Sequence, residues 1–215
     1  MNKHFPSSSK PVKLYGLPVS GHSHRAELMM AFLDVPYEKI DVDLMNGAHK
    51  APDFLNLNLF GQIPVIDDNG DIVSDSNAIL IYLAKKYDRE HAWLPEDPLA
   101  AARVQRWLSI AANEVAAGPG AARLVKLFGL PLDYEVAKTK AANLFATMEP
   151  HLQSHEFLAG DTISIADVAG YTYISHAPEG GVSLEPYPAI RAWLARIEAQ
   201  PRFVGMVRSP EPEAA

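Results

Sequence analysis

The stretch GQIPVIDDNGDIVSDSNAILIYLAKKY, residues 61–87, says most about how this chain folds. Two short apolar runs flank DDNGD, and an Asn-Gly pair between such runs is a strong signal for a hairpin turn. The two runs are therefore predicted to be antiparallel strands. Ile79 and Leu83 then recur at helical spacing. Lys85 and Lys86 suit the negative end of a helix dipole, so the stretch predicts strand, strand, helix.

The residues before this stretch predict a second supersecondary unit. VKLYG, residues 12–16, is typical of a short strand, and a loop then leads into a helical run with Ala26 and Met29 on its apolar face. Residues 37–44, YEKIDVDL, alternate apolar and charged side chains, which is typical of a half-buried strand. Strand, helix and strand together predict a βαβ unit.

The residues after the stretch are predicted to be entirely helical. From Asp97 onward the apolar side chains follow the helical period, as in Val104 and Leu108, and no alternating run appears. The segment AAGPG, residues 116–120, is expected to break or bend its helix. We expect the following organisation: an α/β domain at 11–88, a linker at 89–96, a helical domain at 97–206, and flexible ends at 1–10 and 207–215.

Composition excludes several classes of function. The 215 residues carry 19 Lys and Arg against 26 Asp and Glu, a formal charge of -7, so no basic surface for nucleic acid is expected. No apolar run is long enough for a membrane span, and no apolar segment follows the N-terminus as in a secretory signal. The absence of cysteine excludes disulfides, thiolate zinc sites and a cysteine nucleophile, and makes the cytoplasm the expected location.

The segment ISIAD, residues 163–167, matches a capping box. Ser164 can accept from the backbone N–H of Asp167, whose carboxylate can reach back to the N–H of Ser164. Ile163 and Val168 occupy the positions of a hydrophobic staple. We interpret this segment as structural, since loss of one cap costs about 0.5 to 2 kcal/mol.

Three further positions have both a local and a ligand-binding interpretation. Pro64 is expected at a strand start, an edge or a cis turn, and a cis bond would turn the backbone groups of Ile63 toward an extended ligand. Asp75 and Ser76 stand at a helix start, where they either cap the helix or hold an ammonium and a carboxylate. Ser20, ahead of the first helix, is a cap or a site residue on the same grounds.

Four segments together resemble the cytosolic glutathione transferases, most closely the phi-like, serine-type branch with bacterial relatives. These segments are KLYGLPVS (13–20), GAHKAPDFLNLNLFGQIPV (47–65), SDSNAILIYLA (74–84) and SIAD (164–167). The resemblance implies a thioredoxin-like N-terminal domain, βαβαββα, that binds glutathione, and an all-α C-terminal domain that supplies most of a pocket for a small apolar electrophile. It also implies a homodimer.

The resemblance also implies roles for individual residues. Ser20 falls on the catalytic serine, whose hydroxyl donates to the glutathione sulfur. The residues that fall on glutathione-binding positions are His49, Lys50, Gln62, Ile63, Pro64, Asp75 and Ser76. We expect the second-substrate pocket to include Val19, Gly21, His22 and Glu114.

The implied chemistry is physically sufficient. The nucleophile is a thiolate, whereas a free thiol has a pKa near 8.5, and lowering that pKa by about two units requires roughly 2.7 kcal/mol. A hydroxyl donor to a charged acceptor contributes about 1.5 to 3 kcal/mol, and a helix N-terminus about 0.3 to 1 more. Ser20 and the following helix can therefore supply the stabilisation.

Several alternatives remain open at the level of sequence. Tyr15 is a rival for the thiol, although packing is its expected role, and His22 stands where it can tune the thiolate. No four-ligand cluster surrounds His22 and His24, so we expect no metal. Phe60 is either a residue inserted into a partner subunit or a core residue, and Leu59 replaces a proline common there. The rival functions are a glutathione-dependent peroxidase or disulfide reductase, and a non-enzymatic ligand-binding module.

Overall fold

The computed structural model describes residues 10–211, and its N-terminal part is a four-stranded mixed sheet. The strands are β1 (Val12–Gly16), β2 (Tyr37–Asp41), β3 (Val65–Asp68) and β4 (Asp71–Ser74), in the order β2-β1-β3-β4. β1 and β2 are parallel, and β3 is antiparallel to β1 and to β4. The hairpin turn is made by Asn69 and Gly70, both with positive φ, as the Asn-Gly pair predicts.

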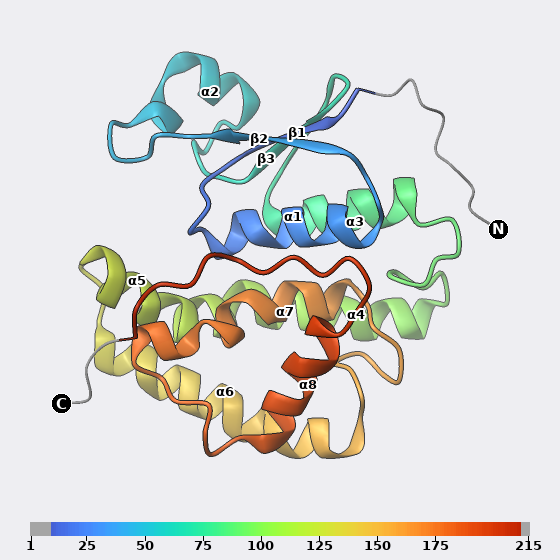
Figure 1. Ribbon diagram of the computed structural model, residues 1–215, viewed down its shortest axis with the longest axis vertical. Coiled ribbons are helices and arrows are strands. Elements are labelled where there is room, and N and C mark those ends of the chain that lie inside the picture. Colours follow the sequence, from blue (N-terminus) through green and yellow to red (C-terminus); the bar gives the residue numbers. More distant parts are fainter. Residues whose placement is uncertain (1–9, 212–215) are drawn as a thin grey trace.

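Helices cover both faces of this sheet (Figure 1). α1 (Gly21–Phe32) and α3 (Ser76–Tyr87) lie on one face, and α2 (Pro52–Leu57) lies on the other, preceded by the short 3₁₀ helix η1 (Ala48–Lys50). The alternation in β1 explains the division, because Val12 and Leu14 join the main core while Tyr15 packs with Phe54 of α2. The thioredoxin-like arrangement expected from the sequence is confirmed.

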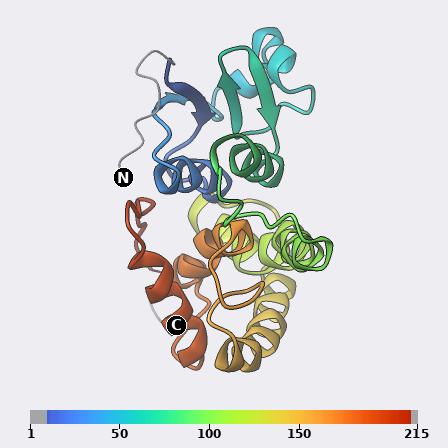
Figure 2. The same ribbon diagram turned by 90° about the vertical axis from the view of Figure 1, so that its right-hand side faces the viewer.

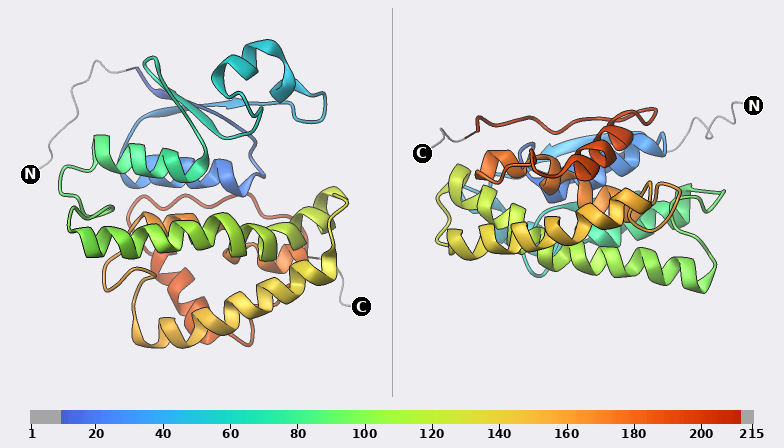
Figure 3. Two further views of the ribbon diagram at one scale, coloured as in Figure 1. Left: turned by 180° about the vertical axis from the view of Figure 1, so that it is seen from behind. Right: turned by 90° about the horizontal axis from the view of Figure 1, so that it is seen from below.

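The second half of the described chain is helical, as predicted. Its α-helices are α4 (Pro98–Ile110), α5 (Ala121–Phe128), α6 (Tyr134–Ser154), α7 (Ile165–Ser175) and α8 (Pro188–Glu198). A 3₁₀ helix, η3 (Ala177–Gly180), follows α7. α4 does not break at AAGPG but continues through a π-helix, η2 (Ala111–Gly120), into α5, so that one long rod results (Figure 3). The wider π turn accommodates Pro119 without ending the helix.

α1 lies between the two halves of the molecule (Figure 2). One side packs on the sheet and α3, and the other packs on α7. Burial from both sides explains why polar residues of its first turns, Ser23, His24 and Arg25, are buried together with Met29 and Met30. The N-terminus of α1 is therefore held by both halves of the chain.

The capping box starts α7 as the sequence predicts. Ser164 Oγ accepts from the N–H of Ala166 at 3.2 Å, and Asp167 Oδ2 accepts from the N–H of Ser164 at 2.9 Å. Asp167 Oδ1 also accepts from the N–H of Leu158 and from Trp193 Nε1, each at 2.9 Å. Because Asp167 is fully buried, these bonds tie α8 and the preceding loop to the start of α7.

Part of the C-terminal segment contacts the helical domain. Residues 207–211 belong to the end that the sequence predicts to be flexible; here the N–H of Ser209 donates to Glu179 at 2.9 Å and Arg208 Nη1 donates to Ser175 O at 3.4 Å. The buried carboxylate of Glu179 needs donors, and Ser209 supplies one. Residues 1–9 and 212–215 of the predicted ends lie outside the described residues. Within the described part, no helix has the length and apolar character to cross a membrane.

Candidate active site

Ser20 caps the N-terminus of α1. Its backbone is extended (φ −87°, ψ 118°), and its Oγ accepts from the N–H of Ser23 at 3.3 Å. The loop before it is short and tight, since Leu17 N–H donates to Ser23 Oγ at 3.2 Å and Ser20 N–H to Leu17 O at 2.9 Å. Because Oγ acts as an acceptor in its cap, the hydroxyl proton of Ser20 remains free to donate to a ligand.

Asp75 caps the N-terminus of α3 in the same region. Its φ is 75°, an uncommon value for a residue other than glycine, and its Oδ1 accepts from the N–H groups of Asn77 and Ala78, both at 2.9 Å. The carboxylate is exposed, whereas Ser76 beside it is buried. Both the capping and the ligand-binding interpretations of this pair are therefore geometrically open, because capping occupies one carboxylate oxygen.

A buried polar cluster joins the starts of α1 and α3. His22 Nδ1 lies 3.0 Å from Ser76 Oγ, and Arg25 Nη1 lies 3.2 Å from that oxygen and 3.1 Å from His22 Nδ1. Arg25 is fully buried, and its Nε and Nη2 have no hydrogen-bond partner among the described residues. Burial lowers the pKa of Arg25 to about 10, which leaves it charged at neutral pH. The sequence did not single out Arg25, which lies in the polar run HSHR at the start of α1.

His22 belongs to this cluster. Burial, with the Arg25 charge as a second cause, lowers the pKa of His22 to about 3, so the imidazole is neutral at neutral pH. The lone pair of its Nδ1 faces Arg25 Nη1 and Ser76 Oγ, and its ring meets the Tyr173 ring edge-on at 5.1 Å. The structure therefore brings His22 to Ser76, on the side of the predicted glutathione residues.

Gly21 is required by close packing. A Cβ built on it would lie 2.7 Å from Cζ of Tyr173, which comes from α7. The Tyr173 ring thus lies directly against the start of α1, and Arg25 Cζ lies 5.5 Å from the centre of the same ring. Tyr173 is a second residue near the site that the sequence did not single out, because it reads as one more core aromatic of α7.

The third part of the site is the segment between α2 and β3. The Ile63–Pro64 peptide is cis, and a cis turn was one of the three placements of Pro64 that the sequence allowed. Lys50 Nζ donates to Phe60 O at 2.9 Å and to Gly61 O at 3.1 Å, and Asn58 Nδ2 donates to Gln62 O at 2.8 Å. Lys50 therefore fixes the turn that leads to Ile63, a role that the sequence did not predict.

The close approach inside this turn depends on glycine. Gly61 has a φ of 57°, and a Cβ there would lie 2.5 Å from His49 O. His49 is half-buried and its Nδ1 has no partner among the described residues, whereas Gln62 is exposed. Gln62 is therefore open to a ligand, His49 has a buried Nδ1 without a partner, and Lys50 uses two of its three N–H donors in the turn.

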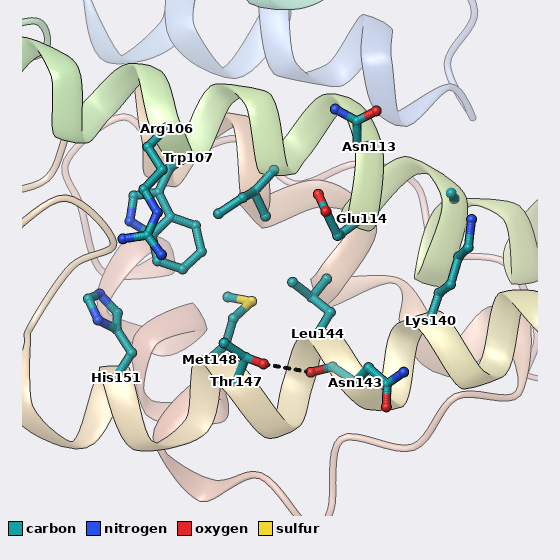
Figure 4. A pocket seen from close by; sticks show the side chains of 12 residues that line it. Arg106, Trp107, Asn113, Glu114, Lys140, Asn143, Leu144, Thr147, Met148 and His151 are labelled. Atoms are coloured by element: carbon teal, nitrogen blue, oxygen red, sulfur yellow. Dashed lines mark hydrogen bonds between the residues drawn. The ribbon is translucent and has the colours of Figure 1, made fainter.

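The structure does not bring Glu114 to the other predicted pocket residues. Glu114 lies on the π-helix η2 and, with Leu144 of α6, lines a cavity of about 510 Å³ (Figure 4). All residues that line this cavity come from α4, η2 and α6, and none comes from the loop of Val19 and Ser20. The π-helix sets the direction of each side chain here, and a sequence pattern based on 3.6 residues per turn cannot give it.

Tyr15 points to the α2 side of the sheet, where its ring meets Phe54 edge-on at 6.5 Å, so packing is its role. Among the described residues no group of three or more His, Cys, Asp or Glu side chains is arranged to hold a metal ion.

A thioredoxin-like domain with a cis-proline segment, a capping serine on α1 and an acidic-Ser pair on α3, followed by a helical domain, defines the cytosolic transferases that use glutathione. The family model for the glutathione S-transferase N-terminal domain matches residues 10–85, and that for the C-terminal domain matches residues 132–201. The chain belongs to the glutathione S-transferase family, whose members use glutathione as co-substrate.

Individual relatives agree with this assignment. The chain is 33% identical to Glutathione S-transferase 3 of Zea mays over 95% of this chain and 98% of that relative. It is 33% identical to Glutathione S-transferase theta-2 of Homo sapiens over 77% of this chain and 71% of that relative. The crystal structure of a glutathione S-transferase from Pseudomonas fluorescens superimposes with a TM-score of 0.86 at 33% identity, covering 92% of this chain and all of that one.

Proposed function

We propose that this glutathione S-transferase activates the glutathione thiol as a thiolate with Ser20, in the manner of the phi-like serine-type branch, and conjugates it to small, largely apolar electrophiles. The supporting observation is the geometry of Ser20. Its Oγ accepts from Ser23 N–H, so its own proton is available to a sulfur placed at the start of α1. The same sulfur would face the positive end of the α1 dipole.

The remaining glutathione groups have suitable partners nearby. Asp75 offers a carboxylate to the γ-glutamyl ammonium, and Ser76 offers a hydroxyl to the γ-glutamyl carboxylate. Ile63, beside cis-Pro64, offers backbone groups to the cysteinyl unit. Gln62 and His49 are free to reach the glycyl carboxylate, while Lys50 contributes mainly by holding the turn.

The test is ultraviolet difference absorbance of glutathione bound to the protein, titrated over pH. In the wild type we expect a thiolate signal with a pKa well below the free-thiol value near 8.5. Ser20→Ala should raise that pKa by about one to two units, because one charge-assisted hydrogen bond contributes roughly 1.5 to 3 kcal/mol. Glutathione affinity should change little, since Asp75, Ser76 and Ile63 are untouched.

Ser164→Ala is the matched control. It removes another helix-capping serine, in α7 and away from the proposed glutathione contacts, so the thiolate pKa should stay at the wild-type value. Glutathione binding without a thiolate signal in the wild type would point to a carrier. An unchanged thiol pKa in Ser20→Ala would mean that another residue activates the thiol. Turnover of hydroperoxides but not of aryl halides would move the reaction class to a peroxidase.

We also propose that the protein is a homodimer in which Phe60 of one chain enters its partner. Phe60 is 70% exposed and Leu59 is 76% exposed, side by side at the end of the Lys50-braced turn. The cavity between α4 and α6, of about 510 Å³, has both polar and apolar walls, including Trp107, Leu144 and Met148, and is large enough for an aromatic ring (Figure 4). In sedimentation experiments the wild type should be a dimer and Phe60→Ser a monomer. A Phe60→Ser variant that stays dimeric would exclude this contact.

A cytoplasmic location is part of the same proposal.

A further inference from the structure

Arg123 of α5 reaches across to the loop that carries Ser20. Its side chain is only 1% exposed, and its Nη1 donates to the backbone carbonyl of Val19 at 2.9 Å. Val19 immediately precedes Ser20, and the peptide between them is planar. A bond that fixes the Val19 carbonyl therefore also fixes the orientation of the Ser20 N–H and the position of its Cα.

The guanidinium is itself held firmly on the helical side. Arg123 Nε donates to Glu179 Oε2 at 2.6 Å, and Glu179 Oε1 accepts from His176 Nδ1 at 2.5 Å and from the N–H of Ser209 at 2.9 Å. η3 lies directly against α5, since a Cβ on Gly180 would come within 2.6 Å of the Arg123 backbone nitrogen. The fork of Arg123 thus connects one rigid carboxylate to one loop carbonyl.

The charge of this pair is balanced. Arg123 and Glu179 are both buried and form an ion pair at 2.6 Å, so their fields largely cancel at a distance. The directional hydrogen bond to Val19 is the contribution that reaches the start of α1. Other backbone bonds of this loop, Leu17 N–H to Ser23 Oγ, Ser20 N–H to Leu17 O and His24 N–H to Ser20 O, are local to the N-terminal domain.

We propose that Arg123 is a positioning residue for Ser20, which it acts on through the Val19 carbonyl, with Glu179 as its anchor. This inference rests on the proposed role of Ser20. Arg123 aligns the Ser20 hydroxyl with the glutathione sulfur from the helical domain, so the thiol is fully activated only when both domains are docked. The residue touches no part of the proposed glutathione subsites at Asp75, Ser76 and Ile63.

The experiment compares thiolate titrations and steady-state kinetics of full-length variants. Arg123→Met with Glu179→Gln removes the bond to Val19 without leaving a buried charge unpaired. We expect the pKa of the bound thiol to rise by about one unit and kcat near pH 6.5 to fall on the order of tenfold, with the glutathione KM within about twofold of wild type. Arg123→Lys keeps the charge pair but has a single nitrogen for two acceptors, so it should show a smaller shift in the same direction.

Arg196→Met is the matched control. Arg196 Nε also donates to a backbone carbonyl, that of Glu156, at 3.0 Å, but at a half-buried position on α8, away from the Ser20 loop. It should titrate as wild type does. Arg123→Lys provides the test if the double variant does not fold.

The outcomes separate the two proposals. A wild type without a thiolate signal, or a Ser20→Ala variant that titrates as wild type, contradicts the role of Ser20. The positioning role alone is overturned by a different result. In that result the wild type shows a thiolate signal and Ser20→Ala raises the thiol pKa, but folded Arg123 variants keep the wild-type pKa and kcat. A fall in melting temperature with unchanged titration would likewise make Arg123 purely structural.

Discussion

Ser20 and Ser164 hold the same local position in different parts of the molecule, and their hydroxyl protons have different fates. Both are N-cap residues with extended backbones, Ser20 on α1 and Ser164 on α7. Ser164 Oγ accepts from Ala166 N–H and donates to Asp167 Oδ2, each at 3.2 Å. Ser20 Oγ accepts from Ser23 N–H and donates to no described residue. A capping hydroxyl that both accepts and donates within the protein contributes to stability. A capping hydroxyl whose proton has no partner can donate to a ligand.

The acidic partners of the two regions differ in the same way. Asp167 is 0% exposed and accepts four hydrogen bonds, and burial nevertheless raises the pKa of its carboxyl. Asp75 is exposed, has a strained φ of 75°, and uses only Oδ1 in capping. The strained backbone is thus found at Asp75, where one carboxylate oxygen stays open to a ligand.

Removing the buried carboxylate of Asp167 should change the free energy of unfolding most. Asp167→Ala leaves buried donors from Leu158, Ser164 and Trp193 without an acceptor, and each such donor costs about 1 to 3 kcal/mol. We expect the free energy of unfolding to fall by about 3 kcal/mol or more in urea titrations. Any folded fraction should keep the wild-type thiol pKa, because the loss is remote from Ser20.

Asp97→Ala is the control for this variant. Asp97 caps α4 at the surface, where its Oδ2 accepts from Ala100 N–H at 2.8 Å, so its loss should cost about 1 kcal/mol. Equal destabilisation of the two variants would contradict the view that burial and saturation make the α7 box the stronger element.

A change of pH should produce the next largest effect, through α1. His24 is buried between Thr172 Oγ1, at 2.8 Å from Nδ1, and Val204 O, at 2.9 Å from Nε2, and burial lowers its pKa to about 4. The unfolded chain binds this proton near pH 6.5, so stability is present above that pH and is lost as the pH falls toward 4. We expect this residue to contribute about 2 kcal/mol of that loss by pH 4.5.

The measurement is urea unfolding at several pH values from 7.5 to 4.5. His24→Gln should be less stable at neutral pH but should lose less stability on acidification than wild type does. The exposed His155→Gln serves as the control and should keep the wild-type slope. A His24→Gln slope equal to that of wild type would show that the acid loss arises elsewhere.

Most of the architecture could be predicted from sequence, because it rests on local signals. The Asn69-Gly70 turn, the alternation in β1 and the helical period after Asp97 each specify their own element. The sequence predicted that AAGPG breaks or bends its helix, but it could not predict that the chain stays helical there as the π-helix η2. The packing of η2 against α6 and α7 keeps this segment helical despite Pro119.

The site was predictable only where a resemblance named its residues. Arg25, Tyr173 and Arg123 were missed, because their roles depend on contacts between segments that lie far apart in the chain. A lone arginine in a helix is ordinarily a surface residue, and sequence gives no burial for it. The one usable signal was that α1 has no single apolar stripe, unlike a helix with one face exposed to solvent.

The smallest predicted effect compares the two caps directly. Ser164→Ala loses an acceptor for Ala166 and a donor to buried Asp167, so it should lower the free energy of unfolding by about 1 to 2 kcal/mol. Ser20→Ala loses one 3.3 Å bond at a half-buried position and should cost about 0.5 kcal/mol. Urea unfolding of both variants gives the difference, and the titration of bound glutathione should rank them in the opposite order. If Ser20→Ala were the more destabilising of the two, the Ser20 hydroxyl would be a structural group, and its proton would not be free for a thiolate.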